Sequence, residues 1–482
     1  MEQLVATADI GSSKIVAMVA RKQYGQYHII ASETRTLDIE DQTKAFVKRG
    51  IITNIPTVAK TVAEMVAKLN QKIEPENLRL EKIYIGYGGQ GLHSQMITMK
   101  RQIDGNPIAR EDLESFLDEL KEDQEYENTR TYFQSYFIDG NYDNNPEGKT
   151  GNTLQAQYLL LKGYNCKDLG KQIEERASKS IEVKRILVSP EATAYAVLED
   201  NERKEGCALV EIGAGLTTVS IYHNNELKFM TTIPIGGYAI TKDISSLKIP
   251  FAEAENHKIK HGNANKIQQD NISTDIPTDE DKLQAINNII AARVKEIAAN
   301  VNEQIIQSQH AANVRTVIIT GGSASLAGLE TIFVENTYRP VRIAISRRTF
   351  VKQDTEETID KANSAVIGMF AMVKENCCKE IKKQVDPIQT GPSKKSVVET
   401  FKEMFFPDEE TLKQSEAAGT LREKEAEKEK KKALEIEKQK QKAKEKAEKE
   451  AEKVNQPGFF DSISDFFFND TTTDGNNNTP KQ

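Results

Sequence analysis

Short apolar runs punctuated by glycine fill the first 375 residues, and charged residues dominate most of the remaining chain. Residues 4–20 form two apolar runs around Gly11, and residues 207–222 repeat this pattern around Gly213. Two apolar runs joined by a glycine-bearing turn are typical of a β-hairpin. In both cases an acidic residue, Asp9 or Glu211, precedes the glycine by two positions. The repeat predicts an α/β chain with two related lobes that face each other.

A third glycine site follows another apolar run. Residues 317–320 have the pattern of a buried strand, a glycine pair comes next, and residues 324–334 have a helical pattern. A strand, a glycine pair and the start of a helix leave backbone N–H groups unpaired, which suits an anion or a flat ligand. The residues of this third site are Gly321, Gly322 and Ser323.

The charged region predicts a separate segment. Residues 419–456 are almost entirely Glu, Lys, Ala and Gln. Glu427 with Lys431, and Glu445 with Lys449, have the i,i+4 spacing that supports a helix. The pattern fits either a semi-rigid helical spacer or a solvated charge tract.

The segment after Pro457 and Gly458 gathers its large apolar residues on one face of a helix. An isolated helix of this kind is expected to be an interfacial membrane helix or a motif that docks in a partner's groove. A second aromatic cluster, residues 401–406, predicts either a docking element or a helix that packs against the body. The predicted membrane-facing residues are Phe459, Phe460, Ile463, Phe466 and Phe467.

Composition narrows the function classes. The chain has 482 residues, which suits more than one domain, and a formal net charge of −8, which argues against nucleic-acid binding. No apolar run approaches the ~20 residues of a membrane span, and the first residues lack a secretory pattern. The four cysteines form no Cys-x-x-Cys motif, which favours reduced thiols. We therefore expect a cytosolic protein whose membrane contact is peripheral.

The two predicted turns have the composition of a polyphosphate site. Backbone N–H groups of a tight turn approach phosphates closely only where the side chains are small. Lys14 would add a positive charge, and Asp9 and Glu211 would hold a hydrated Mg²⁺. The alternative is two ordinary hairpins with small turn residues. The small residues are Gly11, Ser12, Ser13, Gly213, Ala214 and Gly215.

These motifs together resemble the nucleotide-binding pattern of the superfamily of actin, heat-shock chaperones and sugar kinases. Residues 9–14 resemble its first phosphate loop, and residues 211–217 resemble its second, which adds Leu216 and Thr217 to the predicted nucleotide site. Residues 321–323 resemble the adenosine motif. Residues 190–198 and 362–370 resemble the two connecting helices. The resemblance implies ATP and Mg²⁺ as cofactors.

A more specific resemblance is to the FtsA family of bacterial cell-division proteins. It rests on the turn at residues 145–151, the segment 198–207 and three further motifs at residues 233–237, 240–244 and 254–262. On this resemblance Glu255 and Lys258 match the pair that contacts the ribose. The alternative is a solvated pair on a helix surface.

Two departures from the pattern bear on catalysis. The second phosphate loop begins with Glu211 where the family pattern has Asp, and Ser189 precedes Pro190 where hydrolytic relatives often have Glu. ATP hydrolysis requires tight positioning of the attacking water, whereas nucleotide binding tolerates such changes more easily. The departures predict ATP binding with slow or absent hydrolysis, so no catalytic residue is assigned.

The resemblance also implies a domain organisation. We expect an actin-like two-lobed α/β fold with an inserted subdomain, followed by a charged linker and a C-terminal amphipathic helix. The expected parts are a first nucleotide-binding lobe (1–82 and 162–198), an inserted subdomain for polymer contact (83–161), a second nucleotide-binding lobe (199–226 and 303–375), a subdomain that binds the FtsZ tail (227–302), a polar linker (376–418), a charged spacer (419–456), a membrane-targeting helix (457–469) and a disordered tail (470–482).

The implied function is a cytoskeletal adaptor at the cytoplasmic face of the inner membrane. Its expected partners are the C-terminal tail of the tubulin-like FtsZ, further copies of the chain in a head-to-tail polymer, membrane lipids and later division proteins. Asp461 and Asp465 weaken the predicted anchor, so we expect polymerisation to add avidity. The alternatives are a small-metabolite kinase and a pilus-assembly or chaperone-like relative of the same superfold.

Overall fold

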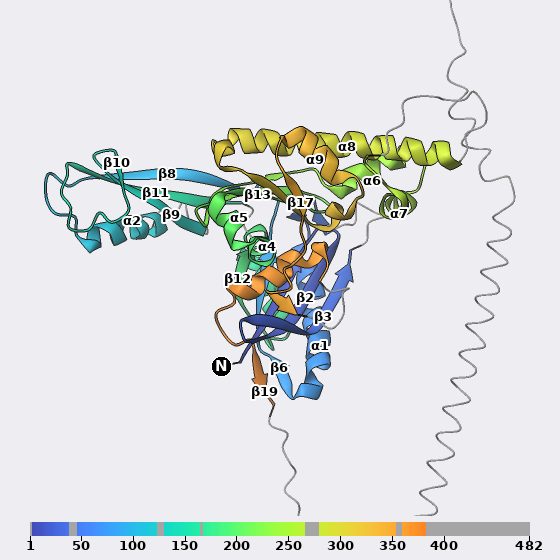
Figure 1. Cartoon of the computed structure of the whole chain (residues 1–482). Coiled ribbons are helices and arrows are strands. Elements are labelled where there is room, and N and C mark those ends of the chain that lie inside the picture. Colours follow the sequence, from blue (N-terminus) through green and yellow to red (C-terminus); the bar gives the residue numbers. More distant parts are fainter. Residues whose placement is uncertain are drawn as a thin grey trace, which may run out of the picture. The chain divides into compact units, whose positions relative to one another are not determined.

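Two β-sheets organise the chain. The computed structural model describes residues 2–37, 46–122, 130–163, 167–265, 279–352 and 359–381. These residues form one compact unit that ends at Lys382. Within it, one sheet has six strands and the other has nine (Figure 1).

The six-stranded sheet forms the first lobe. Its strand order is β12-β7-β1-β2-β3-β18. β1 pairs antiparallel with β2 and parallel with β7, and their central residues are fully buried. The strands are β1 (Gln3–Ile10), β2 (Lys14–Gln23), β3 (Gln26–Thr36), β7 (Lys82–Tyr87), β12 (Glu182–Val188) and β18 (Val351–Lys352).

Helices cover this sheet. α1 (Ile55–Ile73) begins at Asn54, whose side chain accepts a hydrogen bond from Thr57 N at 3.0 Å and so caps the helix. Its apolar stripe, which includes Val62, Leu69 and Ile73, is buried in the core of this lobe. α3 (Lys167–Arg176) packs beside α1, and α4 (Ser189–Val197) packs against α10 (Ser364–Gly368).

The nine-stranded sheet begins in the second lobe. β13 (Cys207–Ile212) and β14 (Thr217–His223) form an antiparallel hairpin, and β16 (Thr316–Thr320) lies parallel to β13. β15 (Glu226–Ile233) lies beside β14, and β17 (Val341–Ile343) forms the edge of the sheet beside β16. Apolar residues of α8 (Asp279–Gln307) and α9 (Leu329–Thr337), among them Val294 and Phe333, complete its core (Figure 1).

The same sheet continues into the inserted subdomain. β8 (His93–Gln102) meets β15 through the pair His93–Thr231, and the order then runs β8-β11-β9-β10. α2 (Arg110–Glu122) covers one face of this extension through Phe116 and Leu120. Figure 1 shows it projecting away from the two lobes. Its other strands are β9 (Arg130–Ile138), β10 (Asn141–Asp143) and β11 (Thr153–Lys162).

The remaining elements are short or lie at the periphery. They are β4 (Val47–Lys48), β5 (Ile51–Ile52), β6 (Leu78–Leu80), α5 (Asp200–Glu205), α6 (Gly237–Ser245), α7 (Phe251–His261) and β19 (Cys378–Glu380).

Both predicted hairpins are confirmed, as are the strand before Gly321 and the first connecting helix. Residues 324–334 are not one helix. A 3-10 helix (Gly322–Ser325) is followed by Gly328 at φ +76°, and α9 starts only after it. The second connecting helix is also broken, into α10 with a 3-10 helix on each side.

Three predicted boundaries need correction. The insert does not begin at residue 83, because β7 pairs with β1 and β12 in the first lobe. The second-lobe subdomain, predicted to bind the FtsZ tail, does not begin at residue 227, because β15 belongs to the second-lobe sheet. Residues 351–352 and 364–381 are neither second lobe nor linker, since β18 already pairs with β3 of the first-lobe sheet. They return to the first lobe, where Phe370 and Cys378 join the core and β19 pairs with β6.

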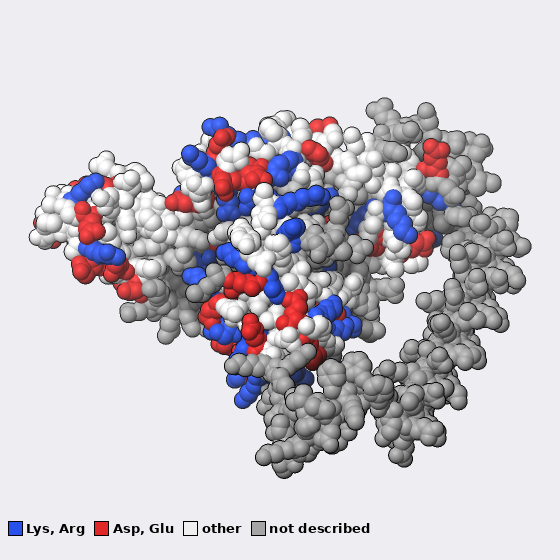
Figure 2. All heavy atoms as spheres, turned by 60° about the horizontal axis from the view of Figure 1, so that its bottom comes forward, with Lys and Arg blue, Asp and Glu red and all other residues white. Residues whose placement is uncertain are grey.

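The predicted charged spacer, the aromatic cluster at 401–406 and the predicted membrane-facing residues lie outside the described residues. Within the described part, no helix combines the length and apolar character needed to cross a bilayer. On the face turned forward in Figure 2, basic and acidic side chains are interspersed.

Candidate functional site

The two hairpin turns lie opposite each other across a cavity of about 300 Å³ between the lobes. The ends of β1, β13 and β16, together with α4, α6 and α7, contribute to its walls. Thr217 is the one predicted residue that does not line it, because its hydroxyl points back to Ile235 O at 2.8 Å. The predicted residues that line it are Asp9, Gly11, Ser12, Ser13, Lys14, Glu211, Gly213, Ala214, Gly215, Leu216, Glu255, Lys258, Gly321, Gly322 and Ser323.

The two turns have the same internal hydrogen bond. Gly11 N donates to Lys14 O at 3.0 Å, and Gly213 N donates to Leu216 O at 2.8 Å. The turns also approach each other closely, since a Cβ on Gly215 would lie 2.6 Å from the Ser12 hydroxyl oxygen. Glycine at position 215 is therefore required by the contact between the lobes.

One helix orients two acidic side chains of the site, Asp9 and Glu211. The Ser189 hydroxyl at the start of α4 donates to Asp9, and the Thr193 hydroxyl one turn later donates to Glu211 Oε2 at 2.8 Å. Burial raises the pKa of Asp9 to about 6 and that of Glu211 to about 7, against the lowering effect of these hydrogen bonds. Two desolvated carboxylates beside a cavity are typical of a site that takes a cationic group.

Two lysines supply positive charge. Lys14 Nζ donates to Asn363 Oδ1 at 2.7 Å, and burial lowers its pKa. Lys258 Nζ lies 2.7 Å from Glu255 Oε2 and donates to the Thr241 hydroxyl at 2.9 Å. Because Lys258 is only 8% exposed, the alternative of a solvated helix pair is wrong.

The third glycine site closes the cavity from the second lobe. Gly321 has φ +92°, in the left-handed region, and a Cβ there would lie 2.5 Å from Ile212 O. The Ser323 hydroxyl donates to Gly213 O at 3.0 Å, which ties this site to the second phosphate-loop turn. The strand end and the hairpin turn therefore form one continuous wall.

Several residues that line the cavity are not among the predicted site residues. They are Gly88, Ser189, Pro190, Gly237, Tyr238, Ile259 and Ala362. Ser189 departs from the family pattern, but its contact with Asp9 spans 180 positions and cannot be read from either segment alone. A signal was available for Pro190, Gly237, Ile259 and Ala362, because each lies in a motif that carries the resemblance.

The cavity fits a magnesium-bound nucleotide by its chemistry. Small turns expose backbone N–H groups for phosphates, and the two carboxylates can hold a hydrated Mg²⁺. In the described part of the chain, no group of three or more His, Cys, Asp or Glu residues could hold a metal alone. The remaining ligands of an Mg²⁺ would therefore come from water and from the phosphates themselves.

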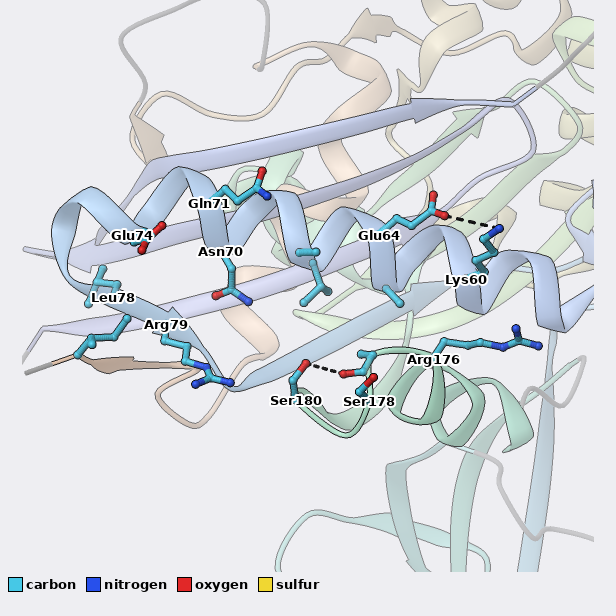
Figure 3. A pocket seen from close by; sticks show the side chains of 15 residues that line it. Lys60, Glu64, Asn70, Gln71, Glu74, Leu78, Arg79, Arg176, Ser178 and Ser180 are labelled. Carbon is cyan, nitrogen blue, oxygen red and sulfur yellow. Dashed lines mark hydrogen bonds and ion pairs between the residues drawn. The ribbon is translucent and has the colours of Figure 1, made fainter.

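A larger cavity, of about 760 Å³, lies elsewhere on the first lobe (Figure 3). It is bounded by α1, β6 and the loop after α3, and Arg79, Arg176 and Ser180 line it. None of the predicted site residues lies there. It has no glycine turns or buried carboxylates, so size alone does not make it the nucleotide site.

Comparisons with known proteins agree with the resemblance seen in the sequence. Residues 208–368 match the family model described as "Cell division protein FtsA". A protein named "Cell division protein FtsA" from Porphyromonas gingivalis is 27% identical over 397 residues, which cover 78% of this chain and 80% of that protein. The protein of the same name from Pseudomonas aeruginosa is 26% identical over 71% of this chain and 83% of its own length.

A solved structure supports the fold independently. The structure titled "PilM-PilN type IV pilus biogenesis complex" has a TM-score of 0.52 at 12% sequence identity and covers 76% of this chain and 98% of that chain. At this identity the likeness concerns the fold alone.

The two lobes with a turn from each at their shared cleft define an actin-like fold. Within that class, the chain is similar to proteins of the FtsA family, which confirms the resemblance found in its motifs.

Proposed function

We propose that this protein is an ATP-binding, actin-like cell division protein that tethers the FtsZ ring to the cytoplasmic face of the membrane. The observation that carries the proposal is the cleft itself. Asp9, Glu211 and the small turns of both lobes line a single cavity, although about 200 positions separate them in the sequence. The names of the similar proteins support the role in cell division.

Each wall of the cleft has a distinct task in this proposal. The turns at Gly11 and Gly213 offer backbone N–H groups to the phosphates, and Lys14 offsets their charge. Asp9 and Glu211 hold the hydrated Mg²⁺, which neutralises the phosphates when bound. The Glu255–Lys258 pair is placed for the ribose, since both line the cavity beside the third glycine site.

Slow or absent hydrolysis follows from the same geometry. The Ser189 hydroxyl is committed to Asp9, and a hydroxyl is a poor general base at neutral pH. Glu191 does not line the cavity. Among the described acidic residues that do, Glu255 is paired with Lys258, and Asp9 and Glu211 are assigned to Mg²⁺. We therefore expect ATP to act as a bound switch.

The wider role rests on the family. We propose that the inserted subdomain makes head-to-tail polymer contacts, that the region after β15 receives the FtsZ C-terminal tail, and that the C-terminal segment binds the membrane. Recruitment of later division proteins completes the role. These assignments rest on the resemblance of the sequence motifs to the FtsA family and on the sequence pattern of residues 457–469.

Calorimetry with MgATP tests the nucleotide site. The proposal expects saturable binding of one ATP per chain and a turnover below ~1 s⁻¹, a low-end kinase value. The absence of binding at millimolar MgATP would refute the proposed nucleotide site.

Co-sedimentation tests the tether. Full-length protein should carry FtsZ onto liposomes in the presence of ATP. A chain lacking residues 457–482 should leave the liposomes while binding MgATP as before. Unchanged pelleting of the shortened chain would exclude this segment as the anchor.

A further inference from the structure

The first turn of α4 has a contact that faces away from the cleft. Ser189 and Thr193 reach the two carboxylates, but Glu191, which lies between them, meets the insert. Its Oε1 accepts from an NH2 group of Arg130 at 2.7 Å, and its Oε2 lies 2.6 Å from Arg130 Nε. Arg130 is the first residue of β9, so this ion pair joins the insert to the helix beneath the nucleotide site.

The ion pair is enclosed. The Glu191 side chain is 6% exposed and that of Arg130 is 29% exposed. Arg130 Nε also donates to the Tyr132 hydroxyl at 2.6 Å. Burial, reinforced by the charge of Glu191, raises the pKa of Tyr132 far above its usual value, so the phenol stays neutral. Removing one partner of a buried pair leaves a charge without compensation, so the loss of either residue alone should be costly.

The same strand is also fixed to the second lobe. Gln134 Nε2 donates to Leu227 O at 3.2 Å, and Lys228 Nζ donates to Gln134 Oε1 at 2.9 Å. Arg130 and Gln134 are four positions apart on β9. A short segment of the insert therefore contacts both α4 of the first lobe and β15 of the second. A change in the angle between the lobes would alter these contacts.

From these contacts we infer that Arg130 is a positioning residue for the nucleotide site. It holds Glu191, and through it the start of α4, whose hydroxyls orient Asp9 and Glu211. Coupling between two sites is reciprocal, so a ligand that fixes the carboxylates also fixes the start of β9. The inference rests on the proposed binding of MgATP in the cleft.

Three variants and one matched control test it. Arg130→Gln and Glu191→Gln each remove one charge, and the double variant removes both without leaving a buried charge unpaired. Arg101→Gln is the control, since Arg101 is also an insert arginine with a 27% exposed side chain, but it pairs with Glu119 inside the insert. Two measurements are made on each full-length chain: the Kd for MgATP, and the hydrogen exchange of residues 130–138 with and without MgATP.

The inference expects Arg130→Gln to raise the Kd about fivefold or more, within the usual range of coupling between sites. The double variant should show the same change as a single one, because both charges act through one contact. MgATP should slow exchange in residues 130–138 of the unaltered chain and of Arg101→Gln, but not of Arg130→Gln. A purely structural role would lower stability without removing this response to the ligand.

Two results would overturn the inference, and they are distinguishable. If the unaltered chain fails to bind MgATP, the proposed function falls and the inference falls with it. If it binds, but MgATP leaves exchange in residues 130–138 unchanged and Arg130→Gln binds within about twofold of the unaltered chain, only the inference falls. If Arg130→Gln fails to fold, the double variant, which carries no unpaired buried charge, takes its place in this comparison.

Discussion

At the scale of single residues, Glu211 shows how a side chain of the cleft is oriented by a distant helix. Its carboxylate takes the place where the family pattern has Asp, and Thr193 holds it at 2.8 Å. The sequence predicted its place in the cleft, because the residue two positions before a hairpin glycine faces the turn. It could not predict Thr193 as the partner, because that contact depends on how α4 packs beneath both lobes.

The raised pKa of Glu211 makes a prediction for stability. The folded state holds the proton more tightly than the unfolded state, where the pKa is near 4.5, so stability falls as pH rises from about 4.5 to about 7. Glu211→Gln removes this penalty, and without nucleotide the variant should be more stable than the parent at pH 8, by on the order of 2–3 kcal/mol. Urea unfolding at pH 8 and pH 4.5 measures the difference.

The two pH values provide the control for this prediction. At pH 4.5 the carboxyl is protonated in the folded state and half protonated in the unfolded state, so the gap should nearly close. A variant that is equally stabilised, or destabilised, at both pH values would show that ionisation of Glu211 is not the cause.

At the scale of elements, the structure shows where local pattern reading succeeds and where it stops. The hairpins at Gly11 and Gly213 were predictable because each is a contiguous segment with its own turn. The return of residues 364–381 to the first lobe was not. A polar stretch surrounds Cys377 and Cys378, and their burial comes from distant partners, such as the bond from Cys377 N to Leu4 O at 2.7 Å.

Because residues 376–381 belong to the first lobe, we expect the stability of a truncated chain to depend on whether it includes them. A chain that ends at residue 375 loses β19, its pairing with Leu78–Leu80 and two buried thiols, whereas a chain that ends at residue 382 keeps them. The shorter chain should be destabilised by about 2–5 kcal/mol, the cost of losing a few buried side chains. Thermal unfolding of both chains checks this, and equal melting temperatures would contradict a role for β19 in the first lobe.

At the scale of the whole molecule, the described chain is held together by two sheets, and the cleft lies between them. The second sheet runs without a break from the second lobe into the insert. The sequence indicated the insert. It did not indicate that the insert continues the second-lobe sheet, because the connection consists of a single residue pair, His93–Thr231. A ligand that bridges the two phosphate-loop turns would act on both lobes at once.

Ligand binding across the cleft predicts a global gain in stability. A ligand at 100 times its Kd adds about 2.7 kcal/mol to the folded state, so saturating MgATP should raise the melting temperature. Gly215→Val should abolish this gain, because a side chain there meets the Ser12 hydroxyl oxygen at 2.6 Å and separates the turns. Differential scanning fluorimetry with MgATP, and with ATP plus a chelator, provides the measurement and its control.

The way in which the insert is attached affects how this fold can change in evolution. The insert leaves the first lobe at Leu92 and returns at Gly163, where a Cβ would lie 3.2 Å from Leu92 Cα. β8 and β11 lie side by side from that point, with His93 opposite Lys162. A module that starts and ends at one place can be gained, lengthened or exchanged without reordering β7 and β12 around it. The lobes can then stay constant while the module diversifies.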